Sequence, residues 1–269
     1  MKKREKVAEG VVTIVFAAVC IIMLLPFVMM VSTSFSADSD ITKYGYSLVP
    51  RSIDLSGYRY VFINPASILS GYKVTILFST VATILGVFLM ALIAYPLSRN
   101  NFNGKKFVNF YLYFTMLFSG GLVPTYILIT KYLHLNNTIW VYILPSLISP
   151  WYIFMMRTFF KDIPEAICES ARIDGASEFR IFTQMILPLS KPVLATVALF
   201  TFLAKWNSWQ EAMLYIDDTN LMSLQYLLQR IMQNIQLLQQ SSEGSVNQLV
   251  SASDIPAESA RMAMAVIVA

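Results

Sequence analysis

The sequence has little charge for its length. Of its 269 residues, 13% are charged and 56% are hydrophobic, whereas an average soluble domain has about 25% charged and about 45–50% apolar residues. The mean hydropathy is +0.58. This composition excludes a surface that faces water on all sides and predicts a chain embedded in a membrane. The net charge of +4 is typical of basic loops beside an anionic membrane. The sequence has no basic run interleaved with exposed aromatic residues, so it gives no indication of a nucleic-acid site.

Residues that carry chemistry are equally scarce. Cys20 and Cys168 are the only cysteines, and the topology below places them on different sides of the membrane, so we expect no disulfide. The single histidine, His134, excludes a typical zinc site. Gly104-Lys105-Lys106 lacks the first glycine and the hydroxyl residue of a phosphate-binding loop. We therefore predict that the chain is not an enzyme and has no cofactor or metal of its own. Any ATP hydrolysis that its function requires must then come from a separate subunit.

Long apolar runs are what the sequence has in abundance. A bilayer-crossing helix needs about 20 mostly apolar residues, and its backbone must satisfy its own hydrogen bonds. The chain therefore predicts one all-α membrane domain over residues 1–269, with five complete spans and a truncated sixth. The predicted spans are 11–31, 70–97, 107–130, 138–160, 192–216 and 260–269.

Basic residues set the predicted orientation. A dense cluster at residues 2–6 precedes the first apolar run and places the amino terminus in the cytoplasm. The first run resembles a cleaved signal peptide, but its length exceeds the usual core of about 7–15 residues, and we interpret it as an uncleaved span. The outer segments are then 32–69, 131–137 and 217–258, and the longest inner loop is 161–191.

The first half of that inner loop predicts a short helix. Pro164 suits a helix start, residues 165–173 follow, and Gly175 stands where a helix naturally stops. One side of this helix is small and apolar, which lets another protein approach closely. The residues on that side are Ala166, Ile167, Ser170, Ala171 and Ile173.

The second half of the loop predicts another short helix. Ser177 can cap a helix over 178–186, which we expect to end before Pro188. The loop is then a helix–glycine–helix segment inside the cytoplasm.

The spacing of this loop resembles the EAA motif of ABC importer permeases. That motif is Glu-Ala-Ala, three residues, Gly, nine residues, Ile, one residue and Leu-Pro, and it is matched by Glu169-Ser170-Ala171, Gly175, Met185 and Leu187-Pro188. Ser170 and Met185 depart from the motif but keep its size classes. The alternative is an ordinary amphipathic loop between spans, which would not require this spacing.

The resemblance implies that the loop docks on a separate ATPase subunit and carries its motion into the spans. Wider similarity, in the segments 118–126, 156–160, 171–176 and 187–192, is to the carbohydrate-uptake branch and its second, maltose-type permease for oligosaccharides and polysaccharides. The implied fold is a six-span type I ABC importer permease. The implied ATPase-coupling residues are Glu165, Glu169, Ser170, Ala171, Asp174, Gly175, Leu187 and Pro188.

The same resemblance implies an assembly in a bacterial plasma membrane. Its expected partners are a homologous second permease, two ATPase subunits that bind ATP and magnesium, an extracytoplasmic substrate-binding protein, membrane lipid and an oligosaccharide. Two other functions stay open. One is a permease for another substrate such as peptides, and the other is a secondary transporter that works alone, although Glu211 is the only acid expected within a span.

Polar and aromatic residues in the fifth span indicate a substrate path. On a continuous helix, Trp206, Trp209, Gln210 and Met213 share one face, and an aromatic face beside amide and carboxylate groups suits a sugar. The alternative is an aromatic belt at the outer membrane interface. The candidate path residues are Trp206, Asn207, Trp209, Gln210 and Glu211. The outer segment 224–240 is amphipathic and predicts either a helix over the outer mouth or a solvated connection.

Overall fold

The computed structural model describes residues 2–63, 65–243 and 256–268. In these ranges every element longer than one bridge is helical, and the one extended pairing is an isolated bridge between Ser36 and Ile53. This confirms the all-α prediction. Residue 269 of the sixth predicted span, residues 244–255 of the last outer segment and the side chains of the basic cluster at 2–6 lie outside the described part.

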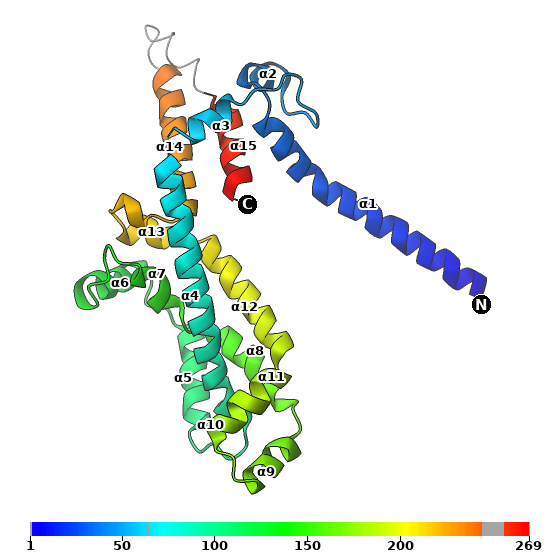
Figure 1. Cartoon of the computed structure of the whole chain (residues 1–269), viewed down its shortest axis with the longest axis vertical. Coiled ribbons are helices and arrows are strands. Elements are labelled where there is room, and N and C mark those ends of the chain that lie inside the picture. The colour runs from blue at the N-terminus through cyan, green and yellow to red at the C-terminus, as the bar shows by residue number, and fades with distance from the viewer. Residues whose placement is uncertain (1, 64, 244–255, 269) are drawn as a thin grey trace. The chain divides into compact units, whose positions relative to one another are not determined.

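The chain divides into two compact units, which are described separately. The first comprises Met1–Ile68 with Leu227–Ala269, and the second comprises Leu69–Tyr226. In the first unit the helices are α1 (Lys2–Ser34), α2 (Asp38–Tyr44), α3 (Ser56–Val61), most of α14 (Leu224–Glu243) and α15 (Ala257–Val268). Figure 1 labels these helices along the coloured chain.

Helix α15 is held by the elements around it. It packs against α1, α2 and α3, and α3 comes so close that a Cβ on Gly57 would lie 2.7 Å from the carbonyl carbon of Ser259. The Asp38 carboxylate accepts hydrogen bonds from the backbone N–H groups of Glu258 and Ser259, at 3.3 and 2.8 Å. These N–H groups belong to the first turn of α15 and have no partner within the helix, so Asp38 satisfies them.

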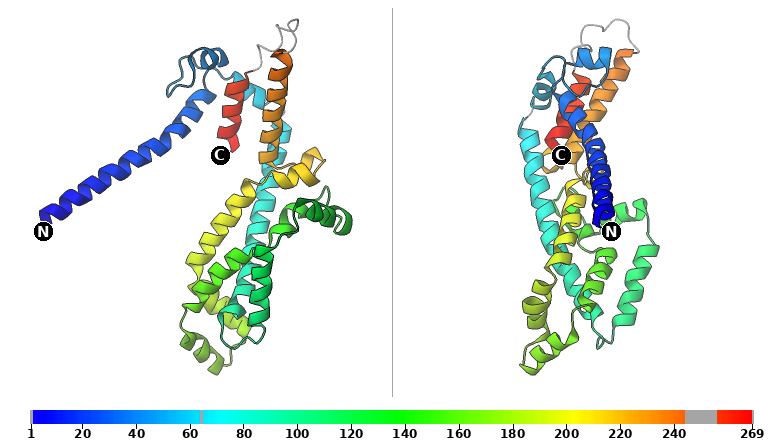
Figure 2. Two further views of the ribbon diagram at one scale, coloured as in Figure 1. Left: turned by 180° about the vertical axis from the view of Figure 1, so that it is seen from behind. Right: turned by 90° about the vertical axis from the view of Figure 1, so that its right-hand side faces the viewer.

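The second unit is built around the long helix α4. Its 34 residues, Pro65–Ser98, form one unbroken helix, and α12 runs beside it in every view (Figures 1 and 2). The other helical elements in the region are α5 (Lys105–Leu117), α6 (Leu122–Ile127), η1 (Leu128–Tyr132), α7 (Trp140–Ile143), η2 (Leu144–Ser146), α8 (Pro150–Lys161), α9 (Glu165–Ile173), α10 (Glu178–Ile181), η3 (Phe182–Ile186), α11 (Leu187–Leu189), α12 (Lys191–Trp206), α13 (Gln210–Tyr215) and η4 (Thr219–Leu221).

Three predicted spans are not continuous helices, and that part of the prediction is wrong. The span 107–130 breaks between α5 and α6 with a bend of 113°. Gly121 lies at this break with φ +84°, a conformation that residues other than glycine rarely adopt. The span 138–160 breaks before Pro150, where Ser149 is extended, as is usual before proline. The span 192–216 is interrupted between α12 and α13.

Two described helices are long and apolar enough to cross a membrane on their own. They are Glu9–Ser34 and Pro65–Ser98, which match the first two predicted spans. The number rises to four when each of two bent pairs is counted as one span: Lys105–Leu117 with Leu122–Tyr132, and Glu178–Leu189 with Lys191–Trp206, the latter bent by 80°. The count of six spans remains a prediction.

The main core of the second unit joins the long inner loop to the spans. Cys168 of α9 and Ile186 of η3 are fully buried beside Ala94 of α4, Met156 of α8 and Val197 of α12. Burial of such side chains contributes about 1.5–3 kcal/mol each for the larger ones. The loop is therefore packed as part of the unit and is not a loose connection.

Candidate functional site

The turn after α9 is fixed by its backbone. The N–H of Ala176 donates to the carbonyl of Ala171 at 2.9 Å, and the N–H of Gly175 donates to the carbonyl of Arg172 at 3.0 Å. This pair of bonds is the Schellman motif, which requires a residue with positive φ after the helix. Gly175 supplies it with φ +80°. The predicted helix 165–173 and its glycine stop are thus confirmed.

The second half of the loop begins as predicted but ends differently. The Ser177 hydroxyl accepts from the N–H of Arg180 at 3.4 Å and caps α10. The helical segment then continues through the π-helical turn Phe182–Ile186 and α11 to Leu189, so the expected end before Pro188 is wrong. Pro188 is the second residue of α11 and lies inside this continued segment, where its missing N–H removes one backbone hydrogen bond.

Helix α9 has one buried and one exposed face. Cys168 and Ala171 are buried against the core, whereas Glu169, Ser170 and Ile173 are exposed, Ile173 by 86%. Single exposed apolar side chains are common at protein surfaces, so this exposure leaves Ile173 available for a partner contact and does not by itself identify one. Ala171, a predicted coupling residue, supports the helix from beneath instead of facing outward.

The other predicted coupling residues lie along the same loop. Asp174 and Gly175 are exposed at its turn, Pro188 is exposed at its end, and Glu165 and Leu187 are half-buried. A hollow of about 220 Å³ lies beside the turn and is lined by Ala171, Asp174, Ala176, Arg180, Ile181, Gln184 and Met185. The exposed turn and this hollow give the loop a shaped outer surface.

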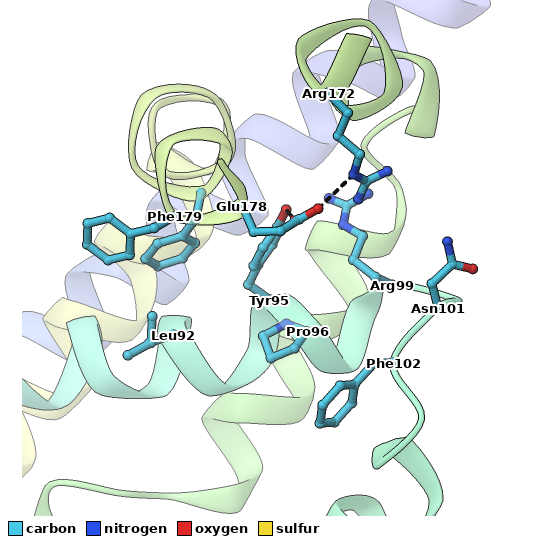
Figure 3. A pocket seen from close by; sticks show the side chains of 10 residues that line it. Leu92, Tyr95, Pro96, Arg99, Asn101, Phe102, Arg172, Glu178 and Phe179 are labelled. Carbon is cyan, nitrogen blue, oxygen red and sulfur yellow. Dashed lines mark hydrogen bonds and ion pairs between the residues drawn. The ribbon is translucent and has the colours of Figure 1, made fainter. Parts of the chain in front are cut away.

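On its inner side the loop is tied to α4 through Glu178. One carboxylate oxygen accepts from the Tyr95 hydroxyl at 2.7 Å, and the other accepts from Nε of Arg172 at 2.7 Å. The hydrogen bonds from Arg172 and Tyr95 hold the pKa of the Glu178 carboxyl below its usual range. Figure 3 shows the Arg172–Glu178 pair with Tyr95 of α4 and Arg99, the residue that follows α4, pointing toward it. No local pattern in the sequence marks Tyr95 or Arg99 as part of this site.

A cavity of about 430 Å³ opens beside this network, between the carboxyl end of α4 and the loop. Its lining residues are Leu92, Tyr95, Pro96, Arg99, Asn101, Phe102, Arg172, Glu178, Phe179 and Phe182. The Arg99 side chain is buried, and within the described residues its Nε and Nη2 atoms have no hydrogen-bond partner. Its guanidinium lies 5.3 Å from the centre of the Tyr95 ring, which gives a cation–π contact.

The second candidate site is the interruption between α12 and α13. Lys205 is buried, and its Nζ lies 3.2 Å from Oε1 of Glu211. The other carboxylate oxygen of Glu211 accepts a hydrogen bond from the Ser208 hydroxyl. The Ser223 hydroxyl donates to the Ser208 carbonyl at 3.0 Å. These bonds stabilise the broken backbone. The expected single face of Trp206, Trp209, Gln210 and Met213 is therefore wrong, since no continuous helix joins them.

The aromatic residues at the interruption still gather around Trp206. Its ring lies 5.9 Å from Phe202 and 6.4 Å from Tyr72 of α4, centre to centre. The exposed Asn207 accepts at its Oδ1 from Nε2 of Gln225 at 3.1 Å. Of the remaining predicted path residues, Trp209 is half-buried and Gln210 is exposed. Aromatic rings and amides are thus close together, although by a different geometry from the predicted one.

Metal chemistry has no visible basis in this part of the chain. Among the residues that the structure describes, no group of three or more His, Cys, Asp or Glu side chains could hold a metal ion. The described thiols, exposed Cys20 and buried Cys168, are both unpaired.

The described residues define a helical protein with helices that are long and apolar enough to cross a membrane. Residues 1–268 match the family model described as "Binding-protein-dependent transport system inner membrane component". The chain belongs to this family. It is a non-catalytic permease subunit of an ABC importer that works with a substrate-binding protein and an ATPase.

Curated relatives extend over most of the chain. It is similar to the polygalacturonan/rhamnogalacturonan transport system permease protein YtcP of Bacillus subtilis, at 34% identity over 94% of this chain and 86% of the relative. Protein LplC of the same organism is 38% identical over 78% of this chain and 70% of LplC. The trehalose/maltose transport system permease protein MalG of Thermococcus litoralis is 29% identical over 80% of this chain and 78% of MalG.

A solved structure has the same fold. It is a chain in the crystal structure of a bacterial ABC transporter involved in the import of the acidic polysaccharide alginate. The TM-score is 0.81 at 24% sequence identity, over 97% of this chain and 91% of the other. The fold of an ABC importer permease is therefore confirmed.

Proposed function

We propose that this permease subunit carries oligosaccharides or polysaccharide fragments into the cell. The support is the set of transport systems named for its relatives, which includes polygalacturonan/rhamnogalacturonan, arabinooligosaccharides and trehalose/maltose. Trp206, Asn207, Trp209, Gln210 and Glu211 border the path in this proposal. The rings around Trp206 offer apolar faces to sugar C–H groups, and the nearby amides suit hydroxyl groups.

The exposed turn of the inner loop supports coupling of this permease to an ATPase subunit. Its backbone is fixed by the Schellman bonds, and Ile173 and Glu169 face outward from a helix anchored by buried Cys168. A rigid helix end with an exposed apolar tip is suited to fit a groove on an ATPase subunit. Movement of that subunit would then be transmitted through Lys191 into α12.

The complete importer in this proposal contains several other chains. A homologous second permease completes the path, two ATPase subunits bind ATP and magnesium, and an extracytoplasmic binding protein delivers the sugar. The amino terminus lies in the cytoplasm, as the basic cluster predicts. Helix α14 belongs to the predicted outer segment 217–258, as a helix over the outer mouth or as a solvated connection. ATP-driven closure of the ATPases would switch access between the two sides.

Transport by the reconstituted complex tests the proposal. The permease would be co-expressed with its second permease, ATPase and binding protein, reconstituted in liposomes and supplied with labelled galacturonan, arabinan and maltose-type oligosaccharides, with peptides for comparison. We expect ATP-dependent uptake of one oligosaccharide class and its loss in Glu169→Lys, with Ile53→Ser as the exposed control. Uptake of peptides alone, or equal uptake by the isolated permease without ATPase, would refute it.

A further inference from the structure

The Glu178 carboxylate is shared between two elements that the sequence places far apart. Tyr95 belongs to the carboxyl end of α4, and Arg172 belongs to the last turn of α9. Both carboxylate oxygens are used, one by each partner, at 2.7 Å. Hydrogen bonds to a charged group are the stronger class in proteins. Glu178 therefore joins α9, α10 and α4 at one point.

The loop also meets α4 through apolar contacts, since Cys168 and Ile186 share one buried core with Ala94. The Phe182 ring lies 5.4 Å from the ring of Tyr95, centre to centre, and the cavity of about 430 Å³ opens beside these contacts. Figure 3 shows the carboxylate above Tyr95, with the Phe179 ring to one side and Arg99 to the other. The cavity leaves open space beside the start of α10, and the hydrogen bonds through Glu178 connect this start to α4.

We propose that Tyr95, Glu178 and Arg172 form a joint that transmits movement of the coupling loop to α4. This inference rests on the proposed function of the loop. The chain already connects the loop to α12 through Lys191, so the joint adds a second route. Because α4 is one unbroken helix of 34 residues, a pull at Tyr95 is carried along its whole length. The three residues are positioning residues and need not touch sugar or ATP.

The joint has a charge arrangement suited to this role. Arg99 adds a second positive charge near Glu178 and, like Arg172, lowers the pKa of that carboxyl. Arg172 and Glu178 are both partly exposed, at 33% and 59% of their side chains, so the pair can rearrange without leaving a charge deeply buried. Tyr95, by contrast, is buried, with only 6% of its surface exposed, and fixes the α4 side of the joint.

The test is the amount of sugar transported per ATP hydrolysed by the full complex in liposomes. Tyr95→Phe keeps the ring contact with Phe182 and removes one hydrogen bond. We expect the complex to assemble and hydrolyse ATP while the sugar-to-ATP ratio falls about 2- to 30-fold, the range of energetic coupling between distant sites. Glu178→Gln should lower the ratio similarly, and the double variant should be no worse than the stronger single one. Tyr152→Phe, a half-buried tyrosine of α8, serves as the control.

The outcomes separate the joint from other roles. An unchanged ratio in both Tyr95→Phe and Glu178→Gln would overturn the inference, as would effects that simply add in the double variant. Loss of ATPase binding in Tyr95→Phe and also in Arg172→Gln would overturn it too, because the residues would then only maintain the fold of the loop. Absence of ATP-driven sugar uptake by the wild-type complex would instead refute the proposed function itself.

Discussion

Nζ of Lys205 lies 3.2 Å from Oε1 of Glu211, and the two residues stand on opposite sides of the interruption between α12 and α13. The lysine also donates to the carbonyl of Tyr142 at 3.4 Å. Lys205 of α12 therefore connects to α13 through the ion pair and to α7 through this hydrogen bond. This arrangement makes Glu211 a structural residue of the broken span as well as a candidate for the sugar path.

Replacing Glu211 should reveal its structural contribution. Glu211→Gln leaves the Lys205 charge buried without its counter-charge, and we expect a loss of about 1.5–3 kcal/mol, seen as a lower Tm of the solubilised complex. The double variant Lys205→Met with Glu211→Leu should lose less than the sum of the single variants, since no unpaired charge remains. Lys73→Met, which alters an exposed lysine of α4, is the control. A fall in uptake with an unchanged Tm would instead assign Glu211 to the sugar path.

Substitutions at Gly175 should weaken ATPase binding in the order set by backbone strain. A Cβ here meets no atom within 4 Å, so the cost comes only from φ +80°, about 1–2 kcal/mol for an ordinary residue. We expect Gly175→Asn to be the mildest change, Gly175→Ala to weaken binding by about 5- to 30-fold, and Gly175→Val to abolish uptake with the chain still in the membrane. Titration of the ATPase against the permease measures the series. Equal binding by all three variants would contradict it.

Ile173 should matter for partner binding and not for folding. Its side chain is 86% exposed, so Ile173→Ser should change stability by no more than about 0.5 kcal/mol. If Ile173 fills a groove on the ATPase, the same change should reduce the affinity by at least about tenfold. The matched control is Ile53→Ser, because Ile53 is 80% exposed in the other unit. Similar ATPase affinity in both variants would remove Ile173 from the interface.

The pH dependence of stability should report the Glu178 contact. Its pKa is lowered in the folded chain, first by Arg172 and then by Tyr95. The contact therefore stabilises the fold fully above the unfolded carboxyl pKa of about 4.3, and this stabilisation is lost as pH falls through the lower folded value. The Tm difference between wild type and Glu178→Gln should stay constant from about pH 7 to about pH 5.5 and shrink below about pH 4. A difference that grows on acidification would reverse this assignment.

Local signals in the sequence were sufficient for the first helix of the inner loop and for the start of the second, but not for the end of the second. The helix 165–173, the stop at Gly175 and the cap at Ser177 depend on neighbours within a few residues, and the structure places them as predicted. Apolar runs also located the two helices, Glu9–Ser34 and Pro65–Ser98, that are long and apolar enough to cross a membrane, since a long run of hydrophobic residues suffices for a long helix.

The interruptions and the joint depend on information that no local pattern contains. Hydropathy averages over a run and is insensitive to one backbone break, so the interruption after Trp206 was missed. That interruption is held by Ser223 bonding to Ser208, a pairing that only the folded chain reveals. The contact between Tyr95 and Glu178 spans 83 positions of sequence, and neither residue differs locally from an ordinary helix residue.

The turn at Gly175 has a consequence for how such importers diversify. Its shape is set by main-chain hydrogen bonds from Gly175 and Ala176 and by the lack of a side chain at one position. The outward residues Glu169, Ser170 and Ile173 take no part in those main-chain bonds. They can therefore be exchanged without altering the turn. The same turn could therefore bind a different ATPase subunit after substitutions at these surface residues alone.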